Sequence, residues 1–224
     1  MVISKTKAAA HTYRLTIQPL GHQPFSYRPQ DFLRILVDDD PHAPLRDRVR
    51  SYSIWNFDAR TQCLDLAVCT FSDGPGARWI ESARAGDDVY FMKHASNLAI
   101  QHDDADAVMI GDISALGHLY GLRRFFRYRD RVTGLIFGHD QADFFPDVDG
   151  ETPFRFMAGG PHSRQAVLSA AEAALPRHAG KTAVYVAGGG EMCQLLYKHL
   201  KNAGWSGKQL KVKPFWIKGK RGLE

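Results

Sequence analysis

The chain has 224 residues, a hydrophobic fraction of 44% and a charged fraction of 24%, a composition that predicts a folded protein with one large domain or two small ones. Its three cysteines, Cys63, Cys69 and Cys193, show no C-x-x-C spacing and are odd in number, which argues against a disulfide framework and against a zinc or iron–sulfur site built from them. No signal-peptide core follows Met1 and no apolar run is long enough to span a bilayer, so we expect a cytoplasmic protein whose net charge of +5 favours anionic partners without choosing among them.

The first hundred residues carry the patterns of β-strands. Residues 12–17 alternate between apolar and polar side chains, and residues 32–37 form a short apolar run that ends in an acidic turn. Further strands are expected at residues 50–57, 63–70 and 89–92. Clusters of Gly, Pro and Asp separate these segments, so the first half predicts a small antiparallel β-barrel.

Beyond residue 105 the pattern changes to an alternation of strands and helices. Strands are expected at residues 107–110, 132–137, 154–157, 184–187 and 211–217, and helices at residues 114–126, 163–175 and 191–203. This order predicts a doubly wound parallel sheet that is covered on both faces and binds ligands at the carboxyl ends of its strands. The polar residues 101–104 are the expected linker, which divides the chain into a barrel domain of residues 1–101 and an α/β domain of residues 102–224.

One strand motif could carry chemistry. In the segment Arg50-Ser51-Tyr52-Ser53, alternate residues share a face, so Arg50 and Tyr52 project together and Ser53 projects to the other side. An arginine suits a diphosphate through bidentate charged bonds, a tyrosine ring can stack on a flat heterocycle, and a hydroxyl can bond a ring nitrogen. Four residues alone are equally compatible with an ordinary amphipathic strand.

Three glycine-containing segments each lie at the start of an expected helix. Residues 74–77 form a Gly-Pro-Gly-Ala turn, and residues 111–115 and 187–192 each follow a strand. Free N–H groups at a helix start bind anions, and glycine lets the backbone approach a ligand closely. None of the segments is G-x-G-x-x-G, and tight turns also use glycine for purely structural reasons, so each signal alone is weak.

In this order the segments resemble the siderophore-interacting proteins, which are FAD-containing ferric-siderophore reductases of the ferredoxin-reductase superfamily. The family's Arg-x-Tyr-Thr/Ser segment is similar to residues 50–53, and its Gly-Pro-Ala-Ser/Ala-Arg-Trp segment to residues 74–79. Its Gly-Asp-Glu-Thr-Ala-Leu segment is similar to residues 111–116, and its closing Tyr-Trp-x-x-Gly to residues 215–219. The resemblance covers most of the chain and implies an FAD-dependent oxidoreductase.

The resemblance also implies which residues bind the cofactors. Arg50 would contact the FAD diphosphate, Tyr52 would lie against the isoalloxazine, and Ser53 would bond its reactive edge near N5. The implied FAD contacts are Arg50, Ser51, Tyr52, Ser53, Cys69, Gly74, Pro75, Gly76, Ala77, Arg78 and Trp79. The implied NAD(P) contacts are Gly111, Asp112, Ser114, Ala115, Ala187, Gly188, Gly189, Gly190, Glu191 and Met192. No side chain is required as a catalytic acid or base, because the redox chemistry belongs to the flavin.

The chain departs from the family pattern at several positions. Trp55 replaces a second arginine, Cys69 a histidine, Ile113 an acidic residue and Gly189 a glutamate, while residues 93–96 replace a Gly-Pro turn. These departures weaken the nicotinamide assignment. The electron donor is therefore either NAD(P)H or a reduced ferredoxin-like protein.

The end of the chain suggests a substrate site. The final strand of this fold comes near the flavin, so we expect Lys213, Lys218 and Lys220, together with Trp216, to help line a basic site for an anionic ferric siderophore. Residue by residue, a solvated basic tail is the simpler interpretation.

Two alternatives remain open. The nearer one is a general NAD(P)H-dependent flavin or ferredoxin reductase on the same fold. The distant one is a non-enzymatic nucleic-acid-binding protein, suggested by the net charge and the basic and aromatic residues 123–129. Those residues end an expected helix, where cations suit the helix dipole and aromatic rings suit the core. The ten histidines include no ligand-like pair four positions apart, so no metal site is expected.

Overall fold

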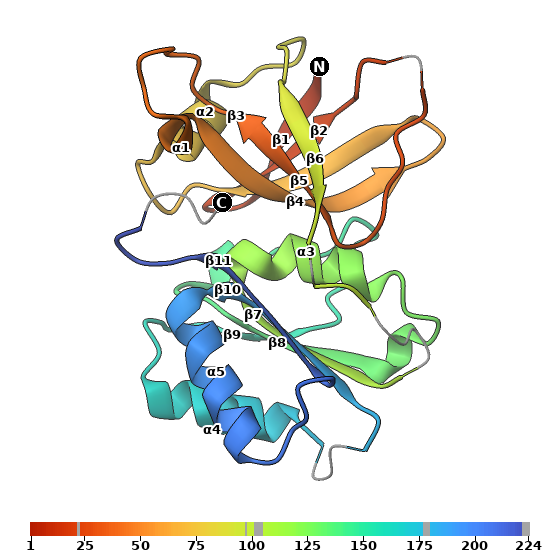
Figure 1. Ribbon diagram of the computed structural model, residues 1–224, viewed down its shortest axis with the longest axis vertical. Coiled ribbons are helices and arrows are strands. Elements are labelled where there is room, and N and C mark those ends of the chain that lie inside the picture. Colours follow the sequence, from red (N-terminus) through yellow and green to blue (C-terminus); the bar gives the residue numbers. More distant parts are fainter. Residues whose placement is uncertain (22, 97, 101–104, 177–179, 221–224) are drawn as a thin grey trace.

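The computed structural model describes residues 1–21, 23–96, 98–100, 105–176 and 180–220. A six-stranded antiparallel sheet lies above a five-stranded parallel sheet, and helix α3 lies between them (Figure 1). This arrangement confirms the expected fold class, a barrel followed by a doubly wound α/β unit. The expected linker, residues 101–104, lies outside the described residues, so the division of the chain at residue 101 stays a prediction.

The antiparallel sheet has the strand order β1-β2-β5-β4-β3-β6. Its strands are β1 (Val2–Ala9), β2 (Thr12–Ile17), β3 (Asp31–Leu36), β4 (Val49–Asp58), β5 (Cys63–Cys69) and β6 (Phe91–Ala95). Alternate residues of these strands, such as Leu15, Leu33 and Leu66, are fully buried in one core cluster. The loop before β6 returns to β1 through the bonds Val2 N to Asp87 O (2.8 Å) and Gly86 N to Val2 O (2.9 Å), so the sheet curls round this core.

The parallel sheet has the order β11-β10-β7-β8-β9. Its strands are β7 (Ala107–Asp112), β8 (Val132–Phe137), β9 (Arg155–Met157), β10 (Ala183–Gly189) and β11 (Leu210–Trp216). The helices are α1 (Leu45–Arg48), α2 (Pro75–Ser82), α3 (Ile113–Arg123), α4 (Arg164–Ala174) and α5 (Gly190–Asn202), with 3₁₀ turns at Arg129–Arg131 and Gln141–Asp143. The strand order reverses between β7 and β10, which is where ligands bind in such sheets.

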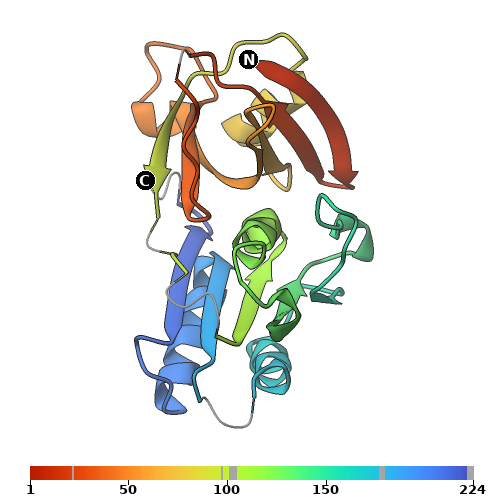
Figure 2. The same cartoon turned by 90° about the vertical axis from the view of Figure 1, so that its right-hand side faces the viewer.

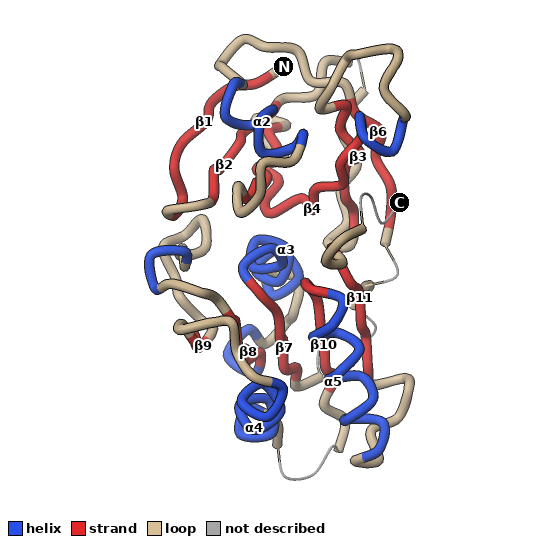
Figure 3. The backbone as a smooth tube through the Cα atoms, turned by 90° about the vertical axis from the view of Figure 1, so that its left-hand side faces the viewer, coloured by secondary structure: helices blue, strands red, loops and turns tan. Residues whose placement is uncertain are grey.

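The helices cover the two faces of the parallel sheet unequally. Helices α4 and α5 lie on the face that points away from the barrel, whereas α3 lies on the face toward it (Figures 2 and 3). The strands alternate accordingly: Val108 and Ile110 of β7 belong to the core cluster under α4 and α5, and Ala107 and Met109 to the cluster under α3.

Helix α3 is buried almost all round because it packs against both sheets. A Cβ atom at Gly117 would lie 2.9 Å from the Ala67 Cβ, and one at Gly121 would lie 3.0 Å from the Trp55 carbonyl oxygen. These two glycines are four positions apart and therefore share one face of the helix. Their small size allows α3 to lie directly on strands β4 and β5.

Polar contacts reinforce this junction. The buried Asp147 carboxylate accepts a hydrogen bond from the Trp55 indole N–H (2.8 Å) and pairs with Arg124, which also donates to the Trp55 carbonyl. Farther along, the His11 Nδ1 lies 2.7 Å from the Asp143 carboxylate. Trp55, which stands where the family has an arginine, thus fills the interface between the two sheets.

Two expectations need correction in detail. The strand expected at 89–92 is β6, which begins two residues later and ends three residues later, so it includes most of the segment 93–96 that replaces the family's turn. The helix expected to end at 126 ends at Arg123, which pairs with Glu151 at 2.8 Å, and Phe126 is buried in the core. Within the segment 123–129, Arg123, Arg124 and Phe126 therefore have structural roles at a helix end, whereas Phe125 and residues 127–129 are exposed. No described helix is long and apolar enough to cross a membrane.

Candidate functional site

A cleft of about 780 Å³ opens between the two sheets, a volume typical of small-molecule and cofactor sites. Strands β3 and β4 and the start of α2 line it on the barrel side. The start of α3 and the end of β11 line it on the other side. The cleft is therefore built by segments as far apart in the sequence as Gln30 and Lys220.

Many of the residues expected at a ligand site meet in this cleft. From the FAD set, the lining includes Arg50, Ser51, Tyr52, Ser53, Gly74, Pro75 and Arg78. From the nicotinamide and substrate sets, it includes Ser114, Lys213, Trp216 and Lys220. The strand motif and the glycine turn, which are separate in the sequence, thus face the same space.

The cleft concentrates positive charge. Among the described residues that line it, five are basic and one, Asp73, is acidic. The basic residues are Arg34, Arg50, Arg78, Lys213 and Lys220. Such a lining favours a ligand that carries phosphate or carboxylate groups, because the low-dielectric walls of a cleft strengthen the attraction.

Tyr52 is held in place by its neighbours on α2. Its ring stacks on that of Trp79, with centroids 5.9 Å apart and planes inclined by 27°. A Cβ atom at Gly76 would lie only 2.3 Å from the Tyr52 hydroxyl oxygen and 3.4 Å from the Arg50 Cγ. Gly76, Ala77 and Trp79 therefore support the cleft from behind rather than line it, and the glycine lets Tyr52 approach α2 closely.

The backbone at the start of α2 offers few donors to an anion. Pro75 has no N–H, and the N–H groups of Ala77 and Arg78 both donate to the Gly74 carbonyl, at 3.0 and 3.1 Å. The N–H of Ala77, one of the implied FAD contacts, is therefore already engaged within the turn. The guanidinium groups are better placed, since those of Arg50 and Arg78 both line the cleft.

Each of these guanidinium groups is anchored by backbone oxygens at the edge of the cleft. Arg50 donates through Nη1 to the Val49 carbonyl (2.6 Å) and the Arg46 carbonyl (2.8 Å), and Arg78 donates to the Asp73 carbonyl. An arginine has five N–H donors, and among the described contacts Arg50 uses only those of Nη1. Its Nη2 and Nε remain to bind an oxyanion.

The crevice between β7 and β10 is occupied by the chain's own side chains. Asp112, the N-cap of α3, accepts hydrogen bonds from the N–H groups of Ser114 (2.9 Å) and Gly189 (2.7 Å) and from the Trp216 indole (3.2 Å). A Cβ at Gly188 would lie 2.6 Å from the Asp112 carboxylate, and one at Gly189 2.9 Å from the Trp216 ring. Burial raises the pKa of Asp112, although these hydrogen bonds oppose the shift.

The glycines of this crevice therefore make room for Asp112 and Trp216. Among the described residues of the nicotinamide set, Ser114 alone lines the cleft. The others lie outside the lining: Gly111, Asp112, Ala115, Ala187, Gly188, Gly189, Gly190, Glu191 and Met192.

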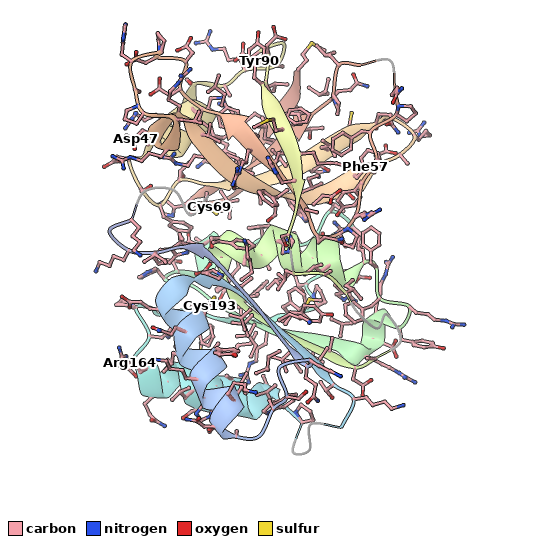
Figure 4. The ribbon with its side chains drawn as sticks, viewed as in Figure 1. Asp47, Phe57, Cys69, Tyr90, Arg164 and Cys193 are labelled. Carbon is pink, nitrogen blue, oxygen red and sulfur yellow. The ribbon has the colours of Figure 1, made fainter. Side chains whose placement is uncertain are left out.

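Two more expected residues lie away from the cleft. The Cys69 sulfur lies 3.6 Å from the Thr12 hydroxyl, at the junction of the two sheets (Figure 4), and burial raises the pKa of this thiol to about 12. Ala67, two residues earlier and on the same face of β5, lines the cleft in its place. Lys218 is exposed and lies beyond the lining.

Several residues of the lining were missed by the sequence reasoning, among them Gln30, Phe32, Arg34, Ser96 and His118. His118 is 3% exposed and borders the cleft from α3, with its ring in a T-shaped contact with that of Phe215 at 5.5 Å. Burial and the nearby charge of Lys213 lower its pKa to about 4, so the imidazole is neutral at pH 7. The available signal was helical periodicity, because His118 follows Ser114 by four positions.

Solved structures share this fold. A siderophore-interacting protein from Acinetobacter baumannii matches with a TM-score of 0.80 and 15% identity, over 97% of this chain and 89% of the other. The siderophore-interacting protein SipS from Aeromonas hydrophila matches with a TM-score of 0.76 and 18% identity, over 98% and 90%. A ferredoxin reductase in carbazole 1,9a-dioxygenase, in its FAD apo form, matches with a TM-score of 0.75 and 16% identity, over 96% and 66%.

No protein-family model matches the sequence, and no curated protein matches it significantly. At the identities of 15–18% the structural matches establish a common fold. They agree with the family that the sequence motifs resemble.

Proposed function

We propose that the protein is an FAD-dependent reductase that passes electrons through FAD to the Fe(III) of a siderophore, so that Fe(II) is released. The observation that carries the proposal is the basic cleft that unites the strand motif 50–53 with the start of α2. The fold shared with siderophore-interacting proteins supports a ferric siderophore as the electron acceptor. The fold shared with a ferredoxin reductase solved in its FAD apo form supports FAD as the cofactor.

The lining fits FAD group by group. Arg50 and Arg78 suit the diphosphate, because a guanidinium binds phosphate oxygens in a planar, bidentate manner. Tyr52 offers a fixed ring for the isoalloxazine, and Ser53 a hydroxyl for its polar edge. When bound, FAD supplies the redox chemistry by accepting electrons from a donor and releasing them singly, while the protein binds and orients it.

The cleft also suggests how a ferric siderophore is held. Lys213, Lys220 and Trp216 line it opposite the barrel. Lysines are point charges that demand little geometry, so they suit a bulky anionic chelate. In this proposal residues 1–101 bind FAD, residues 102–224 form a nucleotide-binding type of domain, and the chelate enters between them.

A lysine substitution series tests this substrate site. The double variant Lys213→Ala/Lys220→Ala is expected to raise the KM for an anionic ferric siderophore and to leave the KM for a neutral one unchanged. Since the Debye length is about 10 Å at 0.1 M salt, the effect should shrink as salt is added. Lys218→Ala is the matched control, because this lysine is exposed on the same segment but outside the lining. An equal loss with both chelates contradicts the site.

The electron donor in this proposal is NAD(P)H or a reduced ferredoxin-type protein. The engagement of Asp112 with Gly189 and Trp216 favours a donor that does not enter the crevice between β7 and β10. Bound flavin should be reduced under argon with NADH, NADPH and a reduced ferredoxin in turn, and the rates compared.

The decisive experiment first detects bound flavin by its absorbance spectrum and then measures reduction of a ferric siderophore. Protein reconstituted with excess FAD should retain a flavin that chromatography, after release by heat, identifies as FAD. Turnover with a ferric siderophore under argon should generate Fe(II), detected with a ferrous chelator. Bound FMN, or no retained flavin, refutes the proposal.

A general flavin or ferredoxin reductase is the second candidate, and the similarity of fold to a ferredoxin reductase favours it. Steady-state kinetics separate the two functions. If kcat/KM is higher for free flavin than for every ferric siderophore tested, the second candidate is the better description.

A further inference from the structure

His118 is a buried polar side chain that has no hydrogen-bond partner among the described residues. Its side chain lines the cleft, and among the described residues neither ring nitrogen has a hydrogen-bond partner. A neutral imidazole carries one N–H donor and one acceptor nitrogen. Leaving such buried groups unpaired costs about 1–3 kcal/mol each, so a histidine is a poor choice here for stability alone.

His118 lies near one end of the cleft. Helix α3 packs on β4 at Trp55, since a Cβ at Gly117 would lie 3.3 Å from the Trp55 Cβ. Arg50 lies five residues earlier on the same strand, which is about 16 Å away in an extended chain. His118 therefore borders the end of the cleft remote from Arg50 and from the start of α2.

The surroundings of His118 suit a flat heterocycle better than a phosphate. Its ring contacts the Phe215 ring, and Ser114 and Ala67 line the same cleft. The imidazole is uncharged at pH 7 and brings no charge of its own to attract a phosphate. The cation near it is Lys213, which the proposed function assigns to the chelate. Both ring nitrogens are shielded from solvent in this structure, so a hydrogen bond to the carbonyl and nitrogen groups on the edge of an isoalloxazine requires the imidazole to turn toward the cleft.

We infer that His118 is a hydrogen-bonding contact for the polar edge of the flavin ring, and that it contributes to flavin affinity and to the flavin's reduction potential. This inference rests on the proposed FAD function. It assigns a role to a residue on α3, whereas the motifs on β4 and α2 account for the rest of the cofactor.

Binding of two ligands, FAD and ADP, tests which part of the cofactor His118 contacts. FAD contains the isoalloxazine and the diphosphate, and ADP contains the diphosphate and adenosine alone. Apoprotein is titrated with each ligand by calorimetry. The variant His118→Leu should weaken FAD binding about fivefold to tenfold, which corresponds to the loss of one hydrogen bond, and should leave ADP binding unchanged. Arg50→Ala should weaken both ligands.

Further measurements separate this role from a structural one. His118→Gln, which keeps a donor and an acceptor, should bind FAD more tightly than His118→Leu. The His118→Leu apoprotein should be at least as stable to heat as the parent, because it loses two unpaired polar atoms. The side-chain ¹⁵N resonances of His118 should shift when FAD is added and stay in place when ADP is added. In the loaded protein, the flavin reduction potential should differ between His118→Leu and the parent.

The control is His199→Ala, on α5, where His199 pairs with Glu172 at 2.8 Å away from the cleft. It should bind FAD as the parent does. If His118→Leu binds FAD as tightly as the parent, or loses ADP and FAD affinity equally, the inference about His118 is wrong while the proposed function stands. If the parent binds no FAD, the proposed function itself fails and the inference fails with it.

Discussion

Substitution of Gly76 tests whether the position of Tyr52 matters for cofactor binding. An alanine Cβ at this position would lie 2.3 Å from the Tyr52 hydroxyl oxygen, whereas ordinary contacts begin at 3.4 Å. The tyrosine must therefore move by about 1 Å, against the stacking of its ring on Trp79. The alanine keeps the N–H group of Gly76, so the change acts on Tyr52 rather than on a backbone donor.

Gly76→Ala should change both the free energy of unfolding and the Kd for FAD. Overpacking costs about 1–3 kcal/mol, and alanine gains about 1 kcal/mol over glycine inside a helix, so the free energy of unfolding should fall by at most about 2 kcal/mol. Misplaced aromatic stacking costs about 0.5–1.5 kcal/mol, which predicts a Kd for FAD that is about twofold to tenfold higher.

The assay is titration of apoprotein with FAD, alongside urea denaturation of the same samples. Gly207→Ala is the matched control, because an added Cβ there would meet nothing within 4 Å and Gly207 lies outside the cleft lining. This variant should bind FAD as the parent does. If Gly76→Ala and Gly207→Ala bind FAD equally well, Tyr52 does not contact the cofactor and the placement of the isoalloxazine is wrong.

Three further predictions concern the interface, the buried histidine and the crevice. Asp147→Ala leaves the buried Trp55 indole N–H without a partner and the Arg124 guanidinium without its carboxylate, so urea denaturation should show that the free energy of unfolding falls by about 3–5 kcal/mol. A fall below about 1 kcal/mol would contradict this role of Asp147. Burial lowers the pKa of His118 from 6.5 in the unfolded chain to about 4 in the folded protein. Protonation therefore favours the unfolded chain, and the free energy of unfolding should fall by about 3 kcal/mol as the pH drops from 6.5 to 4. The free energy of unfolding of the parent should therefore fall more between pH 6.5 and pH 4 than that of His118→Leu. Parallel profiles of the two proteins would refute the lowered pKa of His118. Trp216→Ala should speed flavin reduction by NADH or NADPH, because it opens the space over Gly189; an unchanged rate means that Trp216 does not limit access.

The strands with a clear apolar pattern are predictable from the sequence. β2 and β8 have the expected boundaries, because their alternate or continuous apolar residues meet a core directly. β1 is not predicted, because Lys5 and Lys7 make an edge strand look like a polar tail. The Lys5 amino group instead caps α2, donating to the carbonyls of Ile80 (3.0 Å) and Glu81 (2.9 Å), a contact that no local pattern reveals.

At the candidate site, the sequence predicts the strand motif better than the partners of the glycine-rich turn. All four residues of 50–53 line the cleft, although alternation on a strand places only Arg50 and Tyr52 on the same side. A glycine-rich turn is ambiguous, because it signals close approach without naming the partner. At Gly188 and Gly189 the approaching groups are Asp112 and Trp216, which come from other strands. Only the assembled fold identifies them.

Helix α3 explains why the junction of the two sheets and the cleft are linked. Gly117 and Gly121 set its distance from the barrel, while Ser114 and His118, on the adjoining face, line the cleft. Because each pair is spaced by four positions, a shift of the helix away from β4 would move both cleft residues together. The spacing between the sheets and the shape of the cleft are therefore set by one element, and a larger residue at Gly117 should alter ligand binding without touching the ligand.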